Sequence, residues 1–80
     1  MRGKRVLITG GAGLIGSHIA DLVAAGEPRE IVILDNFVRG RMQNLETAQR
    51  LAEITIVEGD IRDVAMVNET MAGIDVLFHQ

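Results

Sequence analysis

The stretch VLITGGAGLIGSHIAD, residues 6–21, joins a short apolar, β-branched run to a glycine-rich turn and then to a helical pattern. Its glycines stand at positions 10, 11, 13 and 16. Glycine has no Cβ, so it admits positive φ angles and lets another group approach the backbone closely. A turn of this kind, placed between a strand and a helix, predicts a fold in which strands and helices alternate.

The rest of the chain continues this alternation. Short apolar runs predict strands at Arg5–Thr9, Ile31–Asp35, Ile54–Glu58 and Val76–His79. Helical spacing of apolar residues lies between them, at Ile15, Ile19, Leu22 and Val23, then at Met42, Leu45, Gln49 and Ala52, and finally at Val64, Val67 and Met71. Gly26 and Pro28 mark the end of the first helix, and Asp63 is placed to cap the third. Strands that are apolar on both faces predict a parallel sheet with helices on both sides.

The expected order is β-α-β-α-β-α-β, and right-handed crossovers place the strands in the spatial order 3-2-1-4. This is the N-terminal half of a doubly wound α/β sheet, the Rossmann fold. We therefore expect residues 1–80 to form the N-terminal part of a Rossmann domain that is incomplete at its C-terminus. The second half of the sheet and a substrate domain are expected outside these residues.

Composition narrows the class of protein further. The net charge of −3 provides no basic surface for nucleic acid, and no apolar run is long enough for a membrane span. The absence of cysteine excludes disulfides and thiolate metal sites, and no other metal site is predicted. A cytoplasmic protein is the expectation.

In a doubly wound sheet, ligands bind beyond the carboxyl ends of the strands, where the strand order reverses. The glycine-rich turn is expected there, beside unpaired N–H groups at the start of a helix, which stabilise a bound phosphate. The glycines fit G-x-G-x-x-G from Gly11 or G-x-x-G-x-x-G from Gly10, and in both patterns Gly13 admits phosphate while Gly16 admits close helix packing. A P-loop is disfavoured because Ser17 and His18 follow Gly16 where that motif requires Lys and then Ser or Thr.

Asp35 stands 19 residues after Gly16, at the end of the second predicted strand. A carboxylate there can accept hydrogen bonds from the adenosine ribose and repels a 2′-phosphate, which favours NAD over NADP. Arg39 and Arg41 nearby keep NADP open. A simple strand-to-loop turn is the alternative role for Asp35 and Asn36, because both residue types form side-chain turns.

The segments VLITGGAGLIGSH, VILDNFVRG, VEGDIRD and DVLFHQ resemble the extended short-chain dehydrogenase/reductases, in their NAD-dependent epimerase/dehydratase branch. The nearest resemblance is to UDP-glucose 4-epimerases and similar nucleotide-sugar enzymes. It implies that Leu14 and Ile15 present backbone to the pyrophosphate and that Asp35 binds the ribose. It also implies a loop of Asn36, Phe37, Arg39 and Gly40 around the ribose, Asp60 and Ile61 beside the adenine, and Gln80 near the dinucleotide. A core position for Ile61 and a capping role for Asp60 are the alternatives.

The same resemblance implies an enzyme that removes hydride from a sugar carbon of a nucleotide sugar with NAD and then returns it or dehydrates the sugar. Such enzymes use a Tyr-x-x-x-Lys pair, whereas this chain has no tyrosine and a single lysine, Lys4. No catalytic residue is therefore assigned here, and substrate binding and a homodimer are expected of the parent protein. A non-catalytic NAD sensor, another Rossmann oxidoreductase and a purely structural α/β domain remain open alternatives.

Overall fold

The computed structural model describes residues 2–37 and 40–79. Within these residues a parallel sheet is formed by β1 (Arg5–Thr9), β2 (Glu30–Asp35), β3 (Ile54–Glu58) and β4 (Val76–His79). The strands lie in the order β3-β2-β1-β4, which confirms the predicted topology. The predicted strand bounds are confirmed as well, except that β2 begins one residue early because Glu30 pairs with Arg5.

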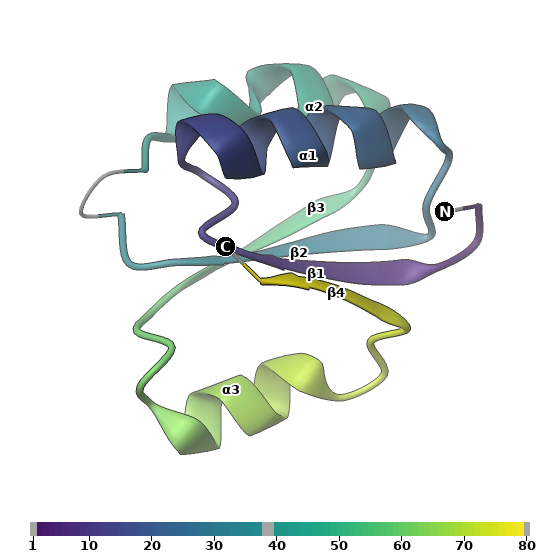
Figure 1. Ribbon diagram of the computed structural model, residues 1–80. Coiled ribbons are helices and arrows are strands. Elements are labelled where there is room, and N and C mark those ends of the chain that lie inside the picture. Colours follow the sequence, from purple (N-terminus) through teal and green to yellow (C-terminus); the bar gives the residue numbers. More distant parts are fainter. Residues whose placement is uncertain (1, 38–39, 80) are drawn as a thin grey trace.

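Helices cover both faces of this sheet. The helix α1 (Leu14–Ala25) lies on one face with α2 (Glu46–Leu51), which the short 3₁₀ helix η1 (Met42–Leu45) precedes. The helix α3 (Val64–Met71) lies on the opposite face (Figure 1). The result is the layered, alternating arrangement of a Rossmann-type fold.

The core is divided by the alternation of side chains along the strands. Val6, Ile8, Ile31 and Ile33 point to the face of α1 and α2, where all of them are fully buried. The intervening Leu7, Val32 and Leu34 pack on the other face, against side chains that include Met66, Val67 and Met71 of α3. Burial on both faces explains why these strands are continuously apolar.

The predicted apolar face of the first helix is confirmed for Val23, which is buried, and for Ile19, which packs against the core, but it is wrong for Ile15 and Leu22. Ile15 is 71% exposed and Leu22 is 76% exposed, whereas the buried positions of α1 are Gly16, Ser17, Ala20, Val23 and Ala24. Four of these five buried residues are small, and at Gly16 the backbone of the glycine-rich turn leaves no room for a side chain.

The second helical segment is also only partly as predicted. It divides into η1 and α2, with Leu45 and Ala48 buried and both Met42 and Gln49 exposed. In α3, by contrast, the predicted cap is confirmed, because the Asp63 carboxylate accepts a hydrogen bond of 3.1 Å from the Met66 N–H. Val64 of the same helix is exposed.

The amino ends of the strands are tied together by side chains. The Glu30 carboxylate accepts hydrogen bonds from Arg5 Nε at 3.0 Å and from the Thr55 hydroxyl at 2.5 Å. The Thr55 hydroxyl, and to a smaller extent Arg5, lower the pKa of Glu30 below its usual value. These contacts link β1, β2 and β3 at the end of the sheet opposite the glycine-rich turn.

Candidate functional site

The glycine-rich turn follows β1 directly and has a defined backbone geometry. Gly10 has a φ of 67°, a left-handed conformation that favours glycine, and its N–H donates to the Leu34 carbonyl at 2.7 Å. The Gly13 N–H donates to the Gly10 carbonyl at 3.2 Å, and the Gly13 carbonyl accepts from the Ser17 N–H at 2.9 Å. The turn therefore closes on itself and leads directly into α1.

Gly13 and Gly16 differ in their surroundings. A Cβ at Gly16 would lie 2.2 Å from the Gly10 carbonyl oxygen and 2.8 Å from the Gly11 Cα, so the packing role predicted for Gly16 is confirmed. A Cβ at Gly13 would meet only the Gly10 oxygen, at an ordinary contact distance of 3.5 Å. The protein's own atoms require glycine at position 16 but not at position 13, where the space beside the backbone is open.

The first turn of α1 presents backbone N–H groups at this open space. Gly13 is the N-cap and supplies no side-chain hydrogen bond, and the first turn contains no acidic residue. Leu14 and Ile15, the first residues of the helix, have exposed side chains. Uncapped N–H groups and the positive end of the helix dipole favour an anion here.

Asp35 ends β2 beside this turn and is 7% exposed. Its Oδ2 accepts the Ala12 N–H at 3.0 Å, and its Oδ1 accepts the Phe37 N–H at 2.7 Å. The bond from the Phe37 N–H is the side-chain turn that the sequence offered as an alternative role for Asp35. The bond from the Ala12 N–H is additional and ties Asp35 to the glycine-rich turn. Each carboxylate oxygen has a further lone pair, so both can still accept ligand hydroxyls.

The loop after β2 lies against the same turn. Phe37 adopts a left-handed φ of 59°, which is costly for an aromatic residue, and its ring packs against the core. A Cβ at Gly40 would lie 2.7 Å from the Ala12 Cβ and 2.8 Å from Asp35 Oδ2. Gly40 thus permits this loop to approach both Ala12 and the carboxylate.

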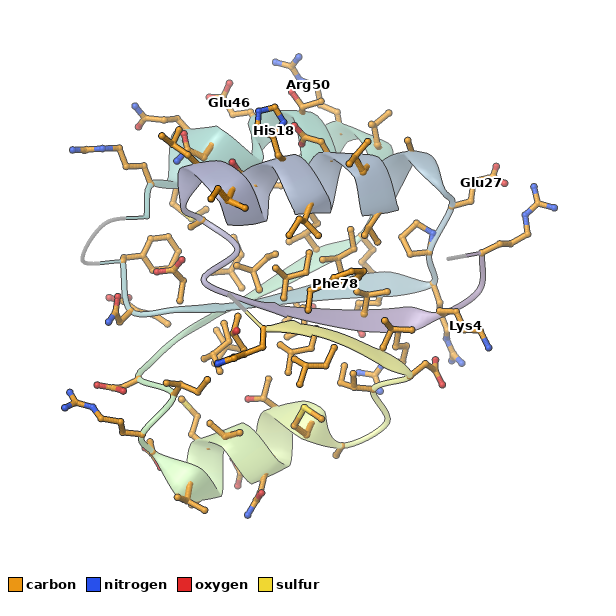
Figure 2. The ribbon with its side chains drawn as sticks, in the orientation of Figure 1. Lys4, His18, Glu27, Glu46, Arg50 and Phe78 are labelled. Carbon is orange, nitrogen blue, oxygen red and sulfur yellow. The ribbon has the colours of Figure 1, made fainter. Side chains whose placement is uncertain are left out.

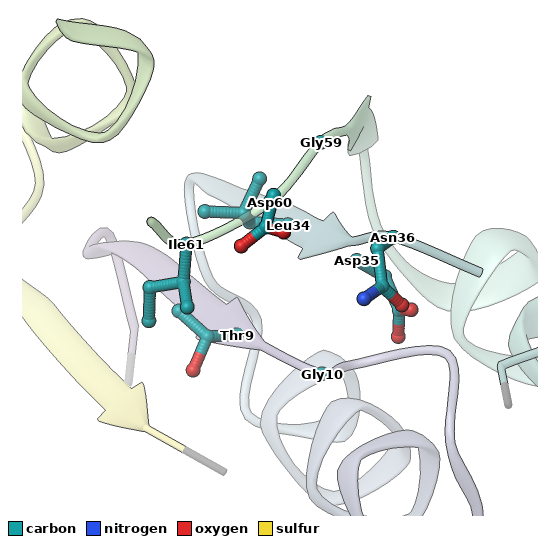
Figure 3. Close-up of a pocket in the computed structure, with 8 residues that line it drawn as sticks. All are labelled: Thr9, Gly10, Leu34, Asp35, Asn36, Gly59, Asp60 and Ile61. Atoms are coloured by element: carbon teal, nitrogen blue, oxygen red, sulfur yellow. The ribbon is translucent and has the colours of Figure 1, made fainter. Parts of the chain in front are cut away.

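A cavity of about 160 Å³ opens between the carboxyl ends of β1, β2 and β3 (Figure 3). It brings together five predicted residues with three others, and its lining consists of Thr9, Gly10, Leu34, Asp35, Asn36, Gly59, Asp60 and Ile61. The volume is below the roughly 300–1,000 Å³ usual for sites that enclose a whole small molecule. It suits one part of a dinucleotide, with the remainder lying outside it.

The loop that follows β3 supplies one wall of the cavity. The Asp60 carboxylate accepts hydrogen bonds from Arg62, with Nη2 to Oδ2 at 2.6 Å, and the Arg62 side chain lowers the pKa of Asp60 to about 2. Ile61 is 46% exposed and lines the cavity, so the alternative of a core position for Ile61 is wrong. Capping of α3 belongs to Asp63 and not to Asp60.

Three residues in the cavity wall, and one that contacts the glycine-rich turn, were not predicted from the sequence. Thr9 lines the cavity and its hydroxyl lies 2.9 Å from His79 Nδ1, while Leu34 and Gly59 complete the wall. Asn44 donates to the Ala12 carbonyl at 2.7 Å. Two predicted residues, Arg39 and Gln80, lie outside the described residues.

Two other titratable residues, Lys4 and His18, do not line the cavity. Lys4 precedes β1, at the opposite end of the sheet, and His18 lies on the outer side of α1 (Figure 2). In residues 2–37 and 40–79, no group of His, Asp or Glu side chains is arranged to hold a metal ion. Over the same ranges, no helix combines the length and apolar character that crossing a membrane requires.

A parallel sheet of order β3-β2-β1-β4, with a glycine-rich β1–α1 turn and an acidic residue ending β2, defines a Rossmann-type domain. Residues 7–80 match the model of the 3-beta hydroxysteroid dehydrogenase/isomerase family. The chain belongs to this family.

Similar proteins include enzymes of nucleotide-sugar metabolism, as the sequence resemblance predicted. The chain is 43% identical over 77 residues to a UDP-N-acetyl-alpha-D-glucosaminuronate decarboxylase of Bacillus cytotoxicus, covering 95% of the chain and 23% of the relative. Among solved structures, it is similar to a UDP-N-acetylglucosamine 4-epimerase of Methanobrevibacter ruminantium, in complex with UDP-N-acetylmuramic acid. That match has 35% identity and a TM-score of 0.84, and covers 100% of this chain and 24% of the epimerase.

A second solved structure is the dTDP-glucose 4,6-dehydratase of Bacillus anthracis in complex with NAD. It has 25% identity and a TM-score of 0.75, and the match covers 95% of this chain and 26% of the dehydratase. The chain therefore spans about a quarter of the length of these relatives.

Proposed function

We propose that these residues form the NAD-binding part of an enzyme that acts on a nucleotide sugar. The observation that carries the proposal is the open, uncapped N-terminus of α1 beside a cavity with Asp35 in its wall. The similarity to a dehydratase solved with NAD and to an epimerase solved with a UDP-linked ligand supports it. The activity, the substrate and a homodimer of the whole protein are part of the same proposal.

The geometry suggests where each part of the coenzyme binds. The adenosine occupies the cavity, with Asp60 and Ile61 beside the adenine and Asp35 and Asn36 beside the ribose. The pyrophosphate lies over the backbone N–H groups of Leu14 and Ile15, in the space that Gly13 leaves open. Phe37 and Gly40 shape the loop beside the ribose, and Arg39 and Gln80 keep the roles that the resemblance implies.

Asp35 favours NAD over NADP in this proposal. Its carboxylate is buried and accepts two backbone N–H groups, so its position is fixed. A 2′-phosphate beside this anion would be repelled, whereas ribose hydroxyls can donate to its remaining lone pairs. We therefore expect tighter binding of NAD.

When bound, NAD supplies the redox chemistry by accepting hydride from a sugar carbon and then returning it. The described residues bind and orient the coenzyme, and the residues that move protons on the sugar are expected elsewhere in the protein. Holding the nicotinamide in a fixed position against the sugar is how this domain would contribute to rate.

Calorimetric titration of the intact gene product with NAD and NADP tests the binding part of the proposal. We expect NAD to bind at least about tenfold more tightly, a difference of about 1.4 kcal/mol. Incubation with a panel of UDP- and dTDP-sugars, followed by chromatography, tests the reaction, with a 3β-hydroxysteroid as the control substrate. Absence of NAD binding would refute the proposal. If the enzyme turned over the steroid and none of the nucleotide sugars, a steroid would replace the nucleotide sugar as the substrate class.

A further inference from the structure

The backbone of Ala12, in the middle of the glycine-rich turn, is held on one side by Asp35 at the end of β2 and on the other by the segment that follows β2. Its N–H donates to Asp35 Oδ2 at 3.0 Å. Its carbonyl accepts the Arg41 N–H at 3.0 Å and the side-chain amide of Asn44 at 2.7 Å. Ala12 itself is fully buried. The turn is therefore clamped to residues that lie more than 20 positions further along the chain.

Asn44 is the side chain that completes this clamp. It lies in η1, where its own N–H donates to the Arg41 carbonyl at 3.1 Å, and its amide is partly buried against the turn. Its neighbour Gln43 carries the same chemical group but is exposed to solvent. The two adjacent amides therefore differ in their surroundings and not in their chemistry.

The two hydrogen bonds to the Ala12 carbonyl fix the orientation of the peptide group that leads into α1. The Ala12 carbonyl and the Gly13 N–H belong to one planar peptide unit, and the Gly13 N–H donates to the Gly10 carbonyl. Glycines on both sides of Ala12 would otherwise give this peptide unusual freedom. Because α1 begins directly after Gly13, fixing this peptide also fixes where the first N–H groups of the helix, those of Leu14 and Ile15, lie.

We propose that Asn44 is a positioning residue for the pyrophosphate of the coenzyme. It acts through the Ala12 carbonyl and does not touch the ligand. The inference rests on the proposed function, because it requires a pyrophosphate to bind at the N-terminus of α1. It predicts that removing the Asn44 amide weakens the binding of ligands that contain a pyrophosphate more than the binding of ligands that lack one.

The test compares Asn44→Leu with the matched control Gln43→Leu in the intact gene product. ADP-ribose and adenosine are titrated by calorimetry, since both contain the adenosine moiety and ADP-ribose adds the pyrophosphate together with a second ribose. For Asn44→Leu we expect about 3- to 10-fold weaker binding of ADP-ribose, the effect of one lost hydrogen bond, and less than about 2-fold for adenosine. Gln43→Leu should change neither affinity.

A purely structural role for Asn44 would give a different result. If Asn44→Leu weakened the binding of both ligands equally, or left the binding of ADP-ribose unchanged, the positioning role would be overturned. The proposal that the protein binds NAD would still stand. Failure of the unmodified protein to bind either ligand would instead refute the proposed function. If Asn44→Leu does not fold, Asn44→Ser, whose shorter side chain cannot span the same distance and so also removes the bond, should show the same selective loss.

Discussion

Alanine substitutions at Gly13 and Gly16 separate the packing of the glycine-rich turn from its binding of phosphate. The Cβ added at Gly16 would lie 2.2 Å from the Gly10 carbonyl oxygen, and the atoms around it are backbone that cannot rotate away. Alanine usually stabilises a helix interior relative to glycine by roughly 0.5–1 kcal/mol. Here we expect Gly16→Ala to reverse that sign and to destabilise the protein by about 1–3 kcal/mol, the usual range for overpacking.

Gly13→Ala should leave the stability of the protein nearly unchanged and should instead weaken coenzyme binding. The added Cβ meets only one atom, at 3.5 Å, and the φ of −76° is accessible to alanine. Loss of glycine at the N-cap costs a few tenths to about 1 kcal/mol, and the stiffer unfolded chain returns about 0.4–1 kcal/mol. Stability should therefore change by less than about 0.5 kcal/mol, while the methyl group occupies the space proposed for the pyrophosphate.

Urea unfolding and calorimetric titration with NAD, both on the intact gene product, measure the two effects. We expect Gly13→Ala to weaken NAD binding about 10- to 100-fold, as an overpacking cost of about 1–3 kcal/mol implies. Gly16→Ala should show its main loss in the unfolding free energy. If Gly13→Ala binds NAD with unchanged affinity, the space beside Gly13 is not a phosphate site and the reasoning is refuted.

Two further predictions concern the loop after β3 and the helix it precedes. Arg62→Ala should raise the pKa of Asp60 from about 2 toward its ordinary value of 3.8, because the Arg62 side chain stabilises the carboxylate. An NMR titration of the Asp60 carboxyl carbon measures this pKa, and finding no rise would contradict the ion pair. Since the folded-state pKa is the lowered one, the stabilisation by this pair is complete above pH 3.8 and is lost as the pH falls through 2. Asp63→Ala should cost about 1 kcal/mol in urea unfolding because α3 loses its N-cap, whereas Asp63→Asn should cost much less; equal losses would show that the cap bond to Met66 is not responsible.

The strands and their order could be predicted because the evidence for them is local. β-branched runs such as those of β1 and β3 stand between turn residues, and right-handed crossovers then allow few arrangements. The cap at Asp63 could be predicted for the same reason, since it depends on residues only a few positions apart. The proximity of Gly10, Asp35 and Asp60 followed from the rule that parallel strands end at the same edge.

The parts that the sequence did not reveal depend on contacts between distant residues. Hydrophobic spacing placed Ile15, Ile19, Leu22 and Val23 on the inner face of α1, but only Ile19 and Val23 contact the core, and the close approach of the turn at Gly16 leaves no local signal beyond the glycine itself. The bond from Asn44 to Ala12 joins residues 32 positions apart and has no local signature. Ile61 was open to a core assignment because an apolar residue in a loop does not reveal that it lines a cavity.

A crystal structure of the intact gene product with NAD tests the central claim most directly. The account predicts pyrophosphate oxygens within about 2.7–3.2 Å of the backbone nitrogens of Leu14 and Ile15. It also predicts the adenosine in the cavity between the ends of β1, β2 and β3, with its ribose hydroxyls on Asp35. Coenzyme bound at another surface, or bound with its pyrophosphate away from the first turn of α1, would contradict the account.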